Sequence, residues 1–259
     1  MTACKICGSE TREAGQHKIL DKYDVKYYYC DHCGFMRTEN PYWLDEAYSA
    51  PINLTDTGYA TRNIFLSKKT LLLFLLLFGE RAVFLDYAGG YGLLTRLMRD
   101  YGLDFYWSDL YTKNIFASEF AYDVNSVKPI SAITCFECFE HFVSPLEEIE
   151  KMLKISKNIF FSTRLMREGE IPDSSWEYYG FDHGQHISFY SAKTFRFIAA
   201  KYGLHYYTNN DNIHLFSEKK AGFYFKLALL ASKLQFDILA RKFIKSKMIS
   251  DAEMLKEKR

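Results

Sequence analysis

The sequence has almost no net charge and no long apolar run, and both absences limit what it can be. With 33 Lys and Arg against 32 Asp and Glu, the formal net charge is +1, which gives no general case for a nucleic-acid partner. The most apolar segment, residues 71–78, is far too short to span a bilayer. The first residues lack a charged start followed by an apolar run, so we expect no signal peptide and a cytoplasmic, reducing setting. No internal repeat is visible.

The composition nevertheless supports a folded protein with a sizeable core. Apolar residues make up 48% of the 259 residues, and aromatic residues alone make up 17%. We expect a small module at residues 1–38, a helical connector or lid at 39–80, a main domain at 81–218 and a basic helical tail at 219–259. The main domain should be α/β.

Two pairs of cysteines lie in the first module, each in a CxxC spacing and each followed by a glycine. In a reducing setting, paired cysteines indicate metal or redox chemistry rather than disulfides. Four thiolates at this spacing suit a tetrahedral zinc ion, and a full set of four indicates a structural site. The predicted ligands are Cys4, Cys7, Cys30 and Cys33. Alternating Val25, Tyr27 and Tyr29 predict a strand that leads into the second pair.

Residues 82–111 predict one βαβ unit. The apolar run 82–85 reads as a buried strand, the turn 88–92 contains three glycines, and residues 93–100 show a helical pattern. A second strand, 105–107, ends near Asp109. Glycines let a ligand approach the backbone closely, a helix start offers unpaired N–H groups, and a carboxylate after the second strand can bind both hydroxyls of a ribose. The alternative is an ordinary strand-turn-helix, but Asp109 favours a nucleotide-like ligand.

The remaining segments extend this unit to a parallel, doubly wound sheet. Strands are predicted at 130–136 and 158–163, with a helix at 145–155 between them. Residues 164–190 are expected to form a long polar and aromatic loop, followed by a helix at 192–202. Segments 205–207 and 213–216 predict an antiparallel hairpin at one edge of the sheet.

The tail has apolar residues at helical spacing among many basic ones. We expect this amphipathic helix to pack on the same chain or on a second subunit, which makes an oligomer one option. The alternative is contact with an anionic membrane surface. The apolar positions are Phe223, Leu227, Leu230, Leu234 and Ile238.

Together these motifs resemble the class I S-adenosylmethionine-dependent methyltransferases, and more narrowly a bacterial subgroup with an N-terminal zinc-binding domain. Segment 85–92, LDYAGGYG, resembles the first motif of that family, and segments 136–141 and 184–191 resemble later ones. The resemblance implies a Rossmann-like methyltransferase sheet preceded by a zinc-ribbon module. The implied cofactor-binding residues are Asp86, Ala88, Gly89, Gly90, Gly92, Asp109, Leu110, Phe136 and Glu137.

One position departs from the family pattern. Ala88 stands where the family usually has glycine, and we expect an alanine to fit there only with a negative backbone angle φ. Gly89 is expected to compensate by a small shift of the turn.

The resemblance also implies a small hydroxylated substrate, such as a sugar or sugar nucleotide of carbohydrate biosynthesis. Methyl transfer from a sulfonium needs alignment and a proton acceptor, and an imidazole titrates near neutral pH. We rank His186 first, His183 second and His141 third as the acceptor. Tyr59 and Tyr179 are candidate substrate contacts. O-methylation is favoured over C-methylation, which needs carbanion stabilisation.

Two other functions remain open from the sequence. An NAD-dependent oxidoreductase would need a further glycine or alanine after Gly92, which residues 93–95 lack. A non-catalytic zinc-ribbon adaptor for nucleic acid would need a basic face, and the near-neutral charge argues against one.

Overall fold

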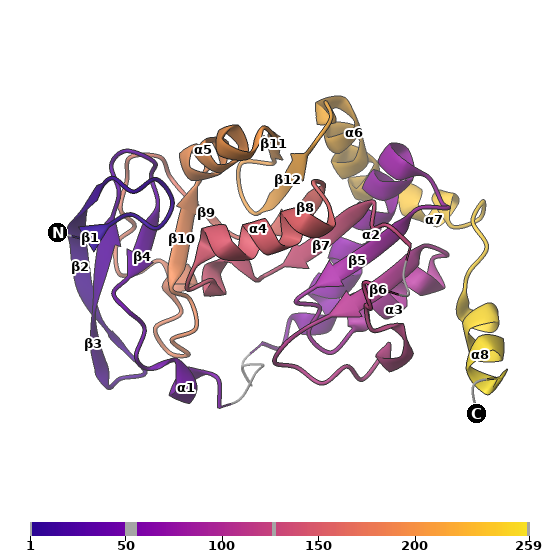
Figure 1. Ribbon diagram of the computed structural model, residues 1–259, viewed down its shortest axis with the longest axis horizontal. Coiled ribbons are helices and arrows are strands. Elements are labelled where there is room, and N and C mark those ends of the chain that lie inside the picture. Colours follow the sequence, from indigo (N-terminus) through magenta and orange to yellow (C-terminus); the bar gives the residue numbers. More distant parts are fainter. Residues whose placement is uncertain (1, 50–55, 126–127, 258–259) are drawn as a thin grey trace. The chain divides into compact units, whose positions relative to one another are not determined.

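The computed structural model describes residues 2–49, 56–125 and 128–257. The chain forms two compact units, each built from separate segments (Figure 1). The first unit contains Met1–Thr55, Glu137–Lys154 and Phe161–Glu218, and the second contains Asp56–Phe136, Ile155–Phe160 and Lys219–Arg259. The expected boundaries at residues 38, 80 and 218 stay predictions, and residues 50–55 of the expected connector lie outside the described residues.

A six-stranded sheet lies in the first unit, in the order β1-β2-β3-β4-β10-β9. The predicted strand before the second cysteine pair is confirmed as part of β3, where Val25, Tyr27 and Tyr29 alternate and are all nearly fully buried. The same core contains Trp43 and Phe189. The strands are β1 (Thr2–Ala3), β2 (Glu10–Ile19), β3 (Tyr23–Tyr29), β4 (Met36–Thr38), β9 (Leu165–Met166) and β10 (Ser188–Ser191).

The prediction of a long loop at residues 164–190 is wrong in part. This segment contains β9, a 3-10 helix η3 (Glu177–Tyr179) and the start of β10. Strand β10 pairs with β4 in antiparallel fashion, Ser188 opposite Arg37, and with β9 in parallel fashion. All four β10 residues are buried. The pairing is with a partner about 150 residues away, so local sequence gives little sign of it.

The other elements of the first unit agree with the sequence. Ser191 caps α5 (Ala192–Tyr202) through a reciprocal bond pattern with Thr194, and Gly203 ends the helix. The predicted hairpin forms as β11 (His205–Thr208) and β12 (Ile213–Ser217), which pair in antiparallel fashion. The remaining helices are α1 (Leu44–Ala47), the 3-10 helix η2 (Phe139–His141) and α4 (Pro145–Ile155).

The second unit contains the predicted βαβ unit. Strand β5 (Val83–Tyr87) pairs in parallel with β6 (Asp104–Ser108) on one side and with β7 (Ala132–Phe136) on the other. Helix α3 (Leu93–Asp100) connects β5 to β6, and α2 (Tyr59–Phe78) precedes the unit. Residues 112–128 contain the 3-10 helix η1 (Ser118–Phe120). The second sheet has the order β11-β12-β8-β7-β5-β6 and includes β8 (Ile159–Ser162). The predicted parallel pairing is confirmed for β5, β6 and β7, and the predicted antiparallel hairpin is confirmed for β11 and β12.

The tail is helical, but it is not one helix. It forms α6 (Gly222–Lys233), α7 (Phe236–Ala240) and α8 (Met248–Glu257). The first break is at Gln235, whose φ of 58° ends the helical path. Helices α6 and α7 contact α2, so packing on the same chain is confirmed for part of the tail. Among the described residues, no helix is long and apolar enough to cross a membrane.

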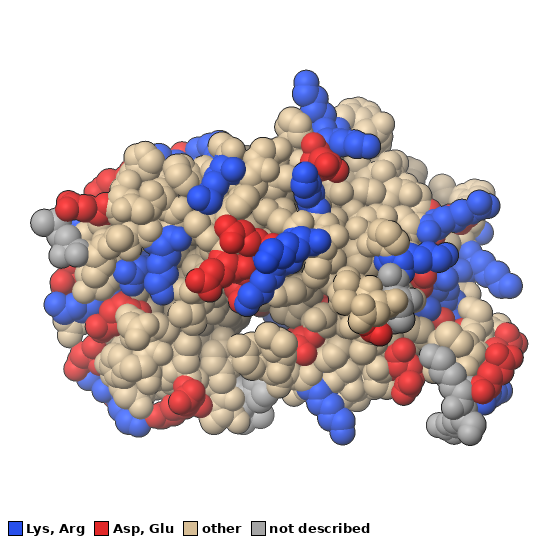
Figure 2. Space-filling model, viewed as in Figure 1, with Lys and Arg blue, Asp and Glu red and all other residues tan. Residues whose placement is uncertain are grey.

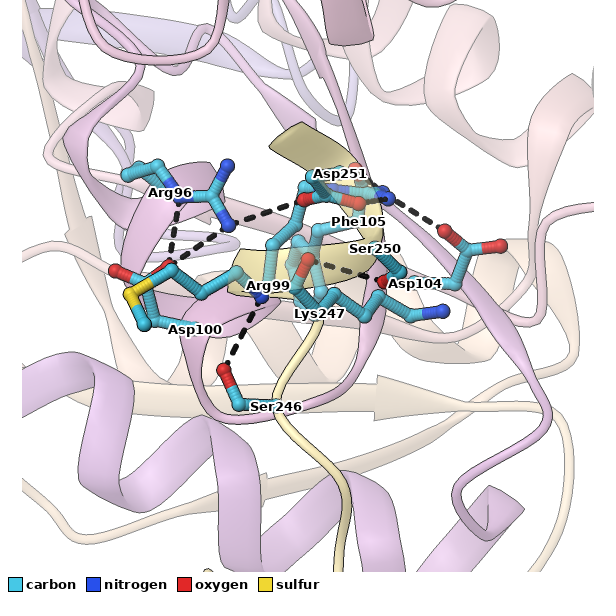
Figure 3. Close-up of polar contacts among 10 residues, drawn as sticks. Arg96, Arg99, Asp100, Asp104, Phe105, Ser246, Lys247, Ser250 and Asp251 are labelled. Atoms are coloured by element: carbon cyan, nitrogen blue, oxygen red, sulfur yellow. Dashed lines mark hydrogen bonds and ion pairs between the residues drawn. The ribbon is translucent and has the colours of Figure 1, made fainter. Parts of the chain in front are cut away.

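A buried ion-pair network fixes α8 to α3 (Figure 3). Arg99 donates two hydrogen bonds of 2.8 Å to the two carboxylate oxygens of Asp251, and both side chains are about 5% exposed. Arg99 also pairs with Asp104 at 2.7 Å and donates to the Phe105 carbonyl. The backbone N–H of Lys247 donates to the Arg99 carbonyl at 3.1 Å. The end of the tail is therefore held by specific contacts.

Replacing Asp251 with alanine is expected to lower the free energy of unfolding by about 3 kcal/mol, because the buried guanidinium of Arg99 loses its main partner. The matched control is Asp100→Ala. Asp100 pairs with Arg96 but is 38% exposed, so its loss should cost less than about 1 kcal/mol. Urea unfolding of both variants measures the difference. Equal losses would show that Arg99 and Asp251 do not fix the tail.

Candidate functional site

The glycine turn between β5 and α3 is tightly packed on its own unit. The indole N–H of Trp107 donates to the Gly90 carbonyl at 2.9 Å, and the Gly89 N–H donates to the Ser108 carbonyl at 3.2 Å. A Cβ added to Gly89 would lie 2.6 Å from Asp86 Oδ2 and 2.7 Å from Trp107 Cδ1. Gly89 is therefore required because neighbouring side chains approach its backbone.

The expected negative φ at Ala88 is wrong. Ala88 adopts a φ of 54°, the left-handed region in which a Cβ costs roughly 1–2 kcal/mol. Gly89 is not among the residues with positive φ. The turn thus keeps the sharp bend that glycine usually makes, and Ala88 adopts it with some strain.

Asp109 lies against the same turn. Its Oδ2 accepts a hydrogen bond from the Gly90 N–H at 2.9 Å, and its Oδ1 accepts from the N–H groups of Tyr111 and Thr112, each at 2.8 Å. These bonds hold the carboxylate at the end of β6, next to the turn after β5. The structure therefore brings together the two features that the sequence assigned to one nucleotide-like ligand.

Asp86 is a buried carboxyl group at the end of β5, and its side chain is 2% exposed. Its oxygens accept hydrogen bonds from Thr134 at 2.8 Å and Thr95 at 3.3 Å. Burial raises the pKa of Asp86 to about 7, and the nearby charge of Asp109 adds to the rise, while the two threonine hydroxyls oppose it. Asp86 can therefore gain or lose a proton near neutral pH, and a cationic ligand group would favour its ionised form.

The raised pKa of Asp86 predicts a pH dependence of stability. Between about pH 4 and pH 7 the folded chain keeps this proton while the unfolded chain has lost it, so the free energy of unfolding falls as pH rises. In the parent, the free energy of unfolding should fall by up to about 3 kcal/mol between about pH 5 and pH 8 because of Asp86, and Asp86→Asn should remove this fall. Urea unfolding at both pH values measures it. The same slope in both proteins would mean that Asp86 ionises normally.

The other predicted cofactor residues lie at several places. Tyr59, a predicted substrate contact at the start of α2, also lies at the glycine turn, because a Cβ on Gly90 would be 3.3 Å from its hydroxyl. Leu110 is 81% exposed, and Phe136 packs edge-on against Phe160. Glu137 has a φ of 50°, which is uncommon for this residue type, and its N–H and carboxylate both bond the Ser162 hydroxyl.

The three predicted histidines lie together in the first unit. Rings of His141 and His186 are 5.1 Å apart, and those of His183 and His186 are 4.7 Å apart. His186 Nδ1 bonds the Tyr178 carbonyl at 2.6 Å, and His141 Nδ1 bonds the Gln185 carbonyl at 3.0 Å. Since a carbonyl only accepts, each Nδ1 carries the proton and each Nε2 keeps its lone pair. His183 differs, because its Nδ1 accepts from the Gln185 N–H at 3.1 Å.

Burial keeps these imidazoles neutral. It lowers the pKa of His141 to about 4 and that of His186 well below the usual range. A charge on His183 lowers the pKa of both rings further, and a charge on His141 lowers that of His186. The pKa of His183 is also lowered by burial. His141 and His186 can therefore accept a hydrogen bond or a proton through Nε2 at neutral pH.

Two residues of this cluster were not predicted as site residues. Glu140 is 1% exposed, and its carboxyl oxygens have no hydrogen-bond partner among the described residues. Burial, then the charge of Glu137, raises the pKa of Glu140 to about 8, so it holds a proton at neutral pH. One oxygen of Glu140 and one ring nitrogen each of His141 and His186 all lie within 4.8 Å of one another.

The second unpredicted residue is Tyr178. Its ring lies 4.6 Å from the His186 ring, and its hydroxyl is 3.0 Å from Thr163 Oγ1. Its neighbour Tyr179, a predicted substrate contact, is 1% exposed in the core of the first sheet and donates to the Pro172 carbonyl. Burial makes Tyr179 a packing residue. Tyr179 as a substrate contact stays a prediction, and its neighbour Tyr178 is the tyrosine that lies beside His186.

The four predicted zinc ligands also come together. Their sulfur atoms all lie within 4.8 Å of one another, with Cys4 Sγ 3.6 Å from Cys33 Sγ and Cys7 Sγ 3.4 Å from Cys30 Sγ. Four convergent thiols are the donor set that zinc prefers. His32 is not in this group, and its ring packs on Phe197.

Comparison with known protein families decides the class of the chain. The model of a family described as "Methyltransferase domain" matches residues 60–209, which is more than half of the chain. The chain belongs to this methyltransferase family. The prediction of an S-adenosylmethionine-dependent methyltransferase is thereby confirmed at the level of enzyme class, and the oxidoreductase and nucleic-acid adaptor alternatives lose their support.

Solved structures with a similar chain are also methyltransferases, at low identity. The plantazolicin methyltransferase BpumL, solved with S-adenosylhomocysteine, has 12% identity and a TM-score of 0.47 over 68% of this chain and 93% of its own. An O-methyltransferase family protein from Burkholderia thailandensis has 15% identity and a TM-score of 0.45 over 69% and 68%. The mitomycin 7-O-methyltransferase MmcR has 12% identity and a TM-score of 0.41 over 68% and 60%. No curated protein matches the sequence.

We call residues 60–209, which match the family model, the family region. Residues 60–209 include the glycine turn, Asp109 and the three histidines that lie together. The four cysteines and the tail lie outside it. The zinc-binding subgroup therefore stays a prediction.

Proposed function

We propose that this methyltransferase transfers a methyl group from S-adenosylmethionine to a hydroxyl oxygen of a small molecule, of the sugar or sugar-nucleotide type. The observation that supports it most is the hydrogen bond from the Gly90 N–H to Asp109 within the family region. The glycine at position 89, where neighbouring side chains approach the backbone closely, and the carboxylate at the end of β6 suit an adenosyl ligand.

On this proposal the family region, residues 60–209, holds the methyl donor. Asp109 accepts hydrogen bonds from the ribose hydroxyls, while Leu110 and Phe136 lie along the adenine. Asp86, Glu137 and the turn residues Ala88, Gly89, Gly90 and Gly92 serve the methionine and adenosine side. The ionised form of Asp86 suits the ammonium group of a methionine moiety.

The bound donor supplies an activated methyl group on a sulfonium with a good leaving group. The protein then has to position the acceptor and remove its proton. We assign His186 as the first candidate base, because its Nε2 keeps a lone pair and its Nδ1–H is fixed by the Tyr178 carbonyl. His141 offers the same arrangement, and His183, whose Nδ1 already accepts a hydrogen bond, ranks after both.

Isotope-labelled methyl transfer tests this function. The full chain is incubated with methyl-labelled S-adenosylmethionine and a panel of free sugars, sugar nucleotides, phenols and amines, and the products are analysed by mass spectrometry. We expect label on an oxygen of a sugar-type acceptor. Label on carbon or nitrogen, or on phenols alone, would contradict the proposed substrate class while leaving the enzyme class in place.

We also propose that Cys4, Cys7, Cys30 and Cys33 hold a structural zinc ion. The four cysteines lie next to short strands such as β1 and β4, which have little core of their own, so metal binding should contribute to the folding of this segment. Protein purified without chelator should contain about one zinc ion per chain, and Cys30→Ser should lose it. Metal analysis by mass spectrometry measures this.

The control for the zinc prediction is Cys135→Ser, since Cys135 is a fully buried cysteine of β7 outside the group. This variant should keep its zinc. Protein with no zinc would contradict the proposal. Zinc that remains in Cys30→Ser would point instead to the group of Glu140, His141 and His186.

A further inference from the structure

The tail exposes most of the apolar residues that should form a packed helix face. Of the 21 large hydrophobic side chains that are exposed among the described residues, eleven lie between residues 223 and 249. They come from α6, α7, the start of α8 and the residues between them, and we call them the tail face. Its members are Phe223, Tyr224, Leu227, Leu230, Leu234, Phe236, Ile238, Leu239, Phe243, Met248 and Ile249.

The tail face remains exposed although the tail is folded onto its own unit. Helix α6 packs on α2 through other positions, among them the buried Phe225 and Ala228. Helix α8 is fixed to α3 by the Arg99–Asp251 pair (Figure 3). The five apolar residues that the sequence placed on the packed stripe are 38–73% exposed instead. Both ends of the tail already have partners, and the described residues of the chain leave this apolar surface uncovered.

The charge around the tail face has one sign. Residues 219–249 contain eight Lys and Arg and a single acid, Asp237. Asp237 is fully buried and bonds Arg241 at 2.7 Å, so it does not offset the exposed lysines. Figure 2 shows Lys and Arg side chains gathered over α7 and the chain that follows it, at the right of the view. The exposed lysines are Lys219, Lys220, Lys226, Lys233, Lys242 and Lys245.

Lys69 of α2 adds a cation beside this surface. It is 6% exposed, has no ion pair with a described residue, and contacts the Phe65 ring. Burial lowers the pKa of Lys69 to about 8, and the charges of Lys233 and Lys68 lower it further. Positive charge is therefore crowded at the α2 and α6 surfaces, and an anion would relieve the repulsion.

An open pocket lies in the middle of the tail face. Its volume is about 310 Å³, and it is lined by Leu234, Gln235, Phe236, Ile238, Leu239 and Lys242. Apolar walls with one lysine suit a molecule that combines an apolar chain with an anionic head.

We propose that the tail face docks on the surface of an anionic lipid bilayer. Apolar residues mixed with lysines are the composition of helices that lie in a membrane interface. A second copy of the chain fits less well, because a twofold contact places the same basic surface on both sides. A nucleic acid would satisfy the lysines but leave the apolar side chains without a partner.

Vesicle flotation with the full chain tests this proposal without a methyl donor or acceptor, so its result does not depend on the proposed activity. The vesicles contain phosphatidylcholine alone or with phosphatidylglycerol. We expect at least about tenfold tighter binding to the anionic vesicles, and a loss of most of this preference at high salt. Equal binding to both vesicles, or no binding to either, would overturn the proposal.

Point variants locate the surface. Leu230→Asp should weaken binding to anionic vesicles at least about tenfold, because it removes an exposed apolar side chain of the tail face. Lys242→Ala should weaken it about fivefold, because it removes an exposed cation beside the tail face. The matched control is Val124→Asp, an exposed apolar residue of the same unit outside the tail face, which should bind like the parent. Thermal melting checks folding, and Leu234→Asp replaces Leu230→Asp if that variant does not fold. Unchanged binding to anionic vesicles in folded Leu230→Asp and Lys242→Ala variants contradicts the proposal. So does a parent chain that forms a dimer and does not bind vesicles, if Leu230→Asp dissociates that dimer.

Discussion

Replacing Gly89 with alanine is expected to lower the affinity for S-adenosylmethionine at least about tenfold, because overpacking this turn costs roughly 1–3 kcal/mol and displaces its side chains. The added Cβ would lie under 3 Å from both Asp86 Oδ2 and Trp107 Cδ1. Trp107 also holds the Gly90 carbonyl, so its movement changes the turn itself. Calorimetric titration of the donor measures the affinity.

The neighbouring position supplies the matched control. Ala88 has a positive φ, so Ala88→Gly relieves strain instead of creating a clash. We expect this variant to bind the donor with the affinity of the parent. Its free energy of unfolding should be roughly 1 kcal/mol higher than that of the parent. If Gly89→Ala binds as well as Ala88→Gly, the turn does not hold the donor in the way proposed.

Replacing His186 with alanine is expected to lower kcat by about 10²–10⁴-fold if its imidazole removes the proton of the acceptor. The loss should fall on kcat more than on KM, because the proton moves only as the transition state forms. The pKa of His186 lies well below the usual range, so kcat of the parent at saturating donor should not fall as pH drops through about 6.5, the ordinary pKa of histidine.

Two variants separate the base from its surroundings. His205→Ala removes a histidine of β11, outside the cluster, and should leave kcat unchanged. The raised pKa of Glu140 keeps its carboxyl protonated and neutral at neutral pH. Glu140→Gln puts another neutral group in its place, so only a small loss of kcat is expected. If Glu140→Gln loses most of kcat while His186→Ala stays active, Glu140 rather than His186 is the base.

The elements that local sequence determines were predicted well. The strand, glycine turn, helix and strand of residues 82–109 all form, because each is specified by its own apolar pattern and turn residues. The four cysteines converge because two short spacings fix them in pairs. The cap at Ser191 and the hairpin after Gly203 are likewise local.

Features that depend on distant partners were missed. Strand β10 was expected to be loop, because its pairing with β4 brings together residues about 150 positions apart. The placement of Tyr178 and Tyr179 has a similar cause, since one residue of register decides which ring lies beside His186 and which enters the core. Periodicity also predicted an apolar face for the tail, but it did not show that this face stays exposed.

The strain at the glycine turn could not be predicted from residue type. A positive φ at alanine is uncommon, so sequence reasoning assigned the flexible role to the adjacent glycine. The structure reverses the roles: Ala88 makes the bend, and Gly89 makes room for Asp86 and Trp107. Such an exchange depends on side chains that approach from β5 and β6.

The most direct test of this account is a calorimetric titration of the full chain with S-adenosylhomocysteine, with and without Asp109→Ala. The account predicts binding of about one molecule per chain in the parent, and affinity at least about tenfold lower in the variant, because Asp109 loses its bonds to the ribose. No binding to the parent, equal binding to both proteins, or binding of NADH instead would contradict it.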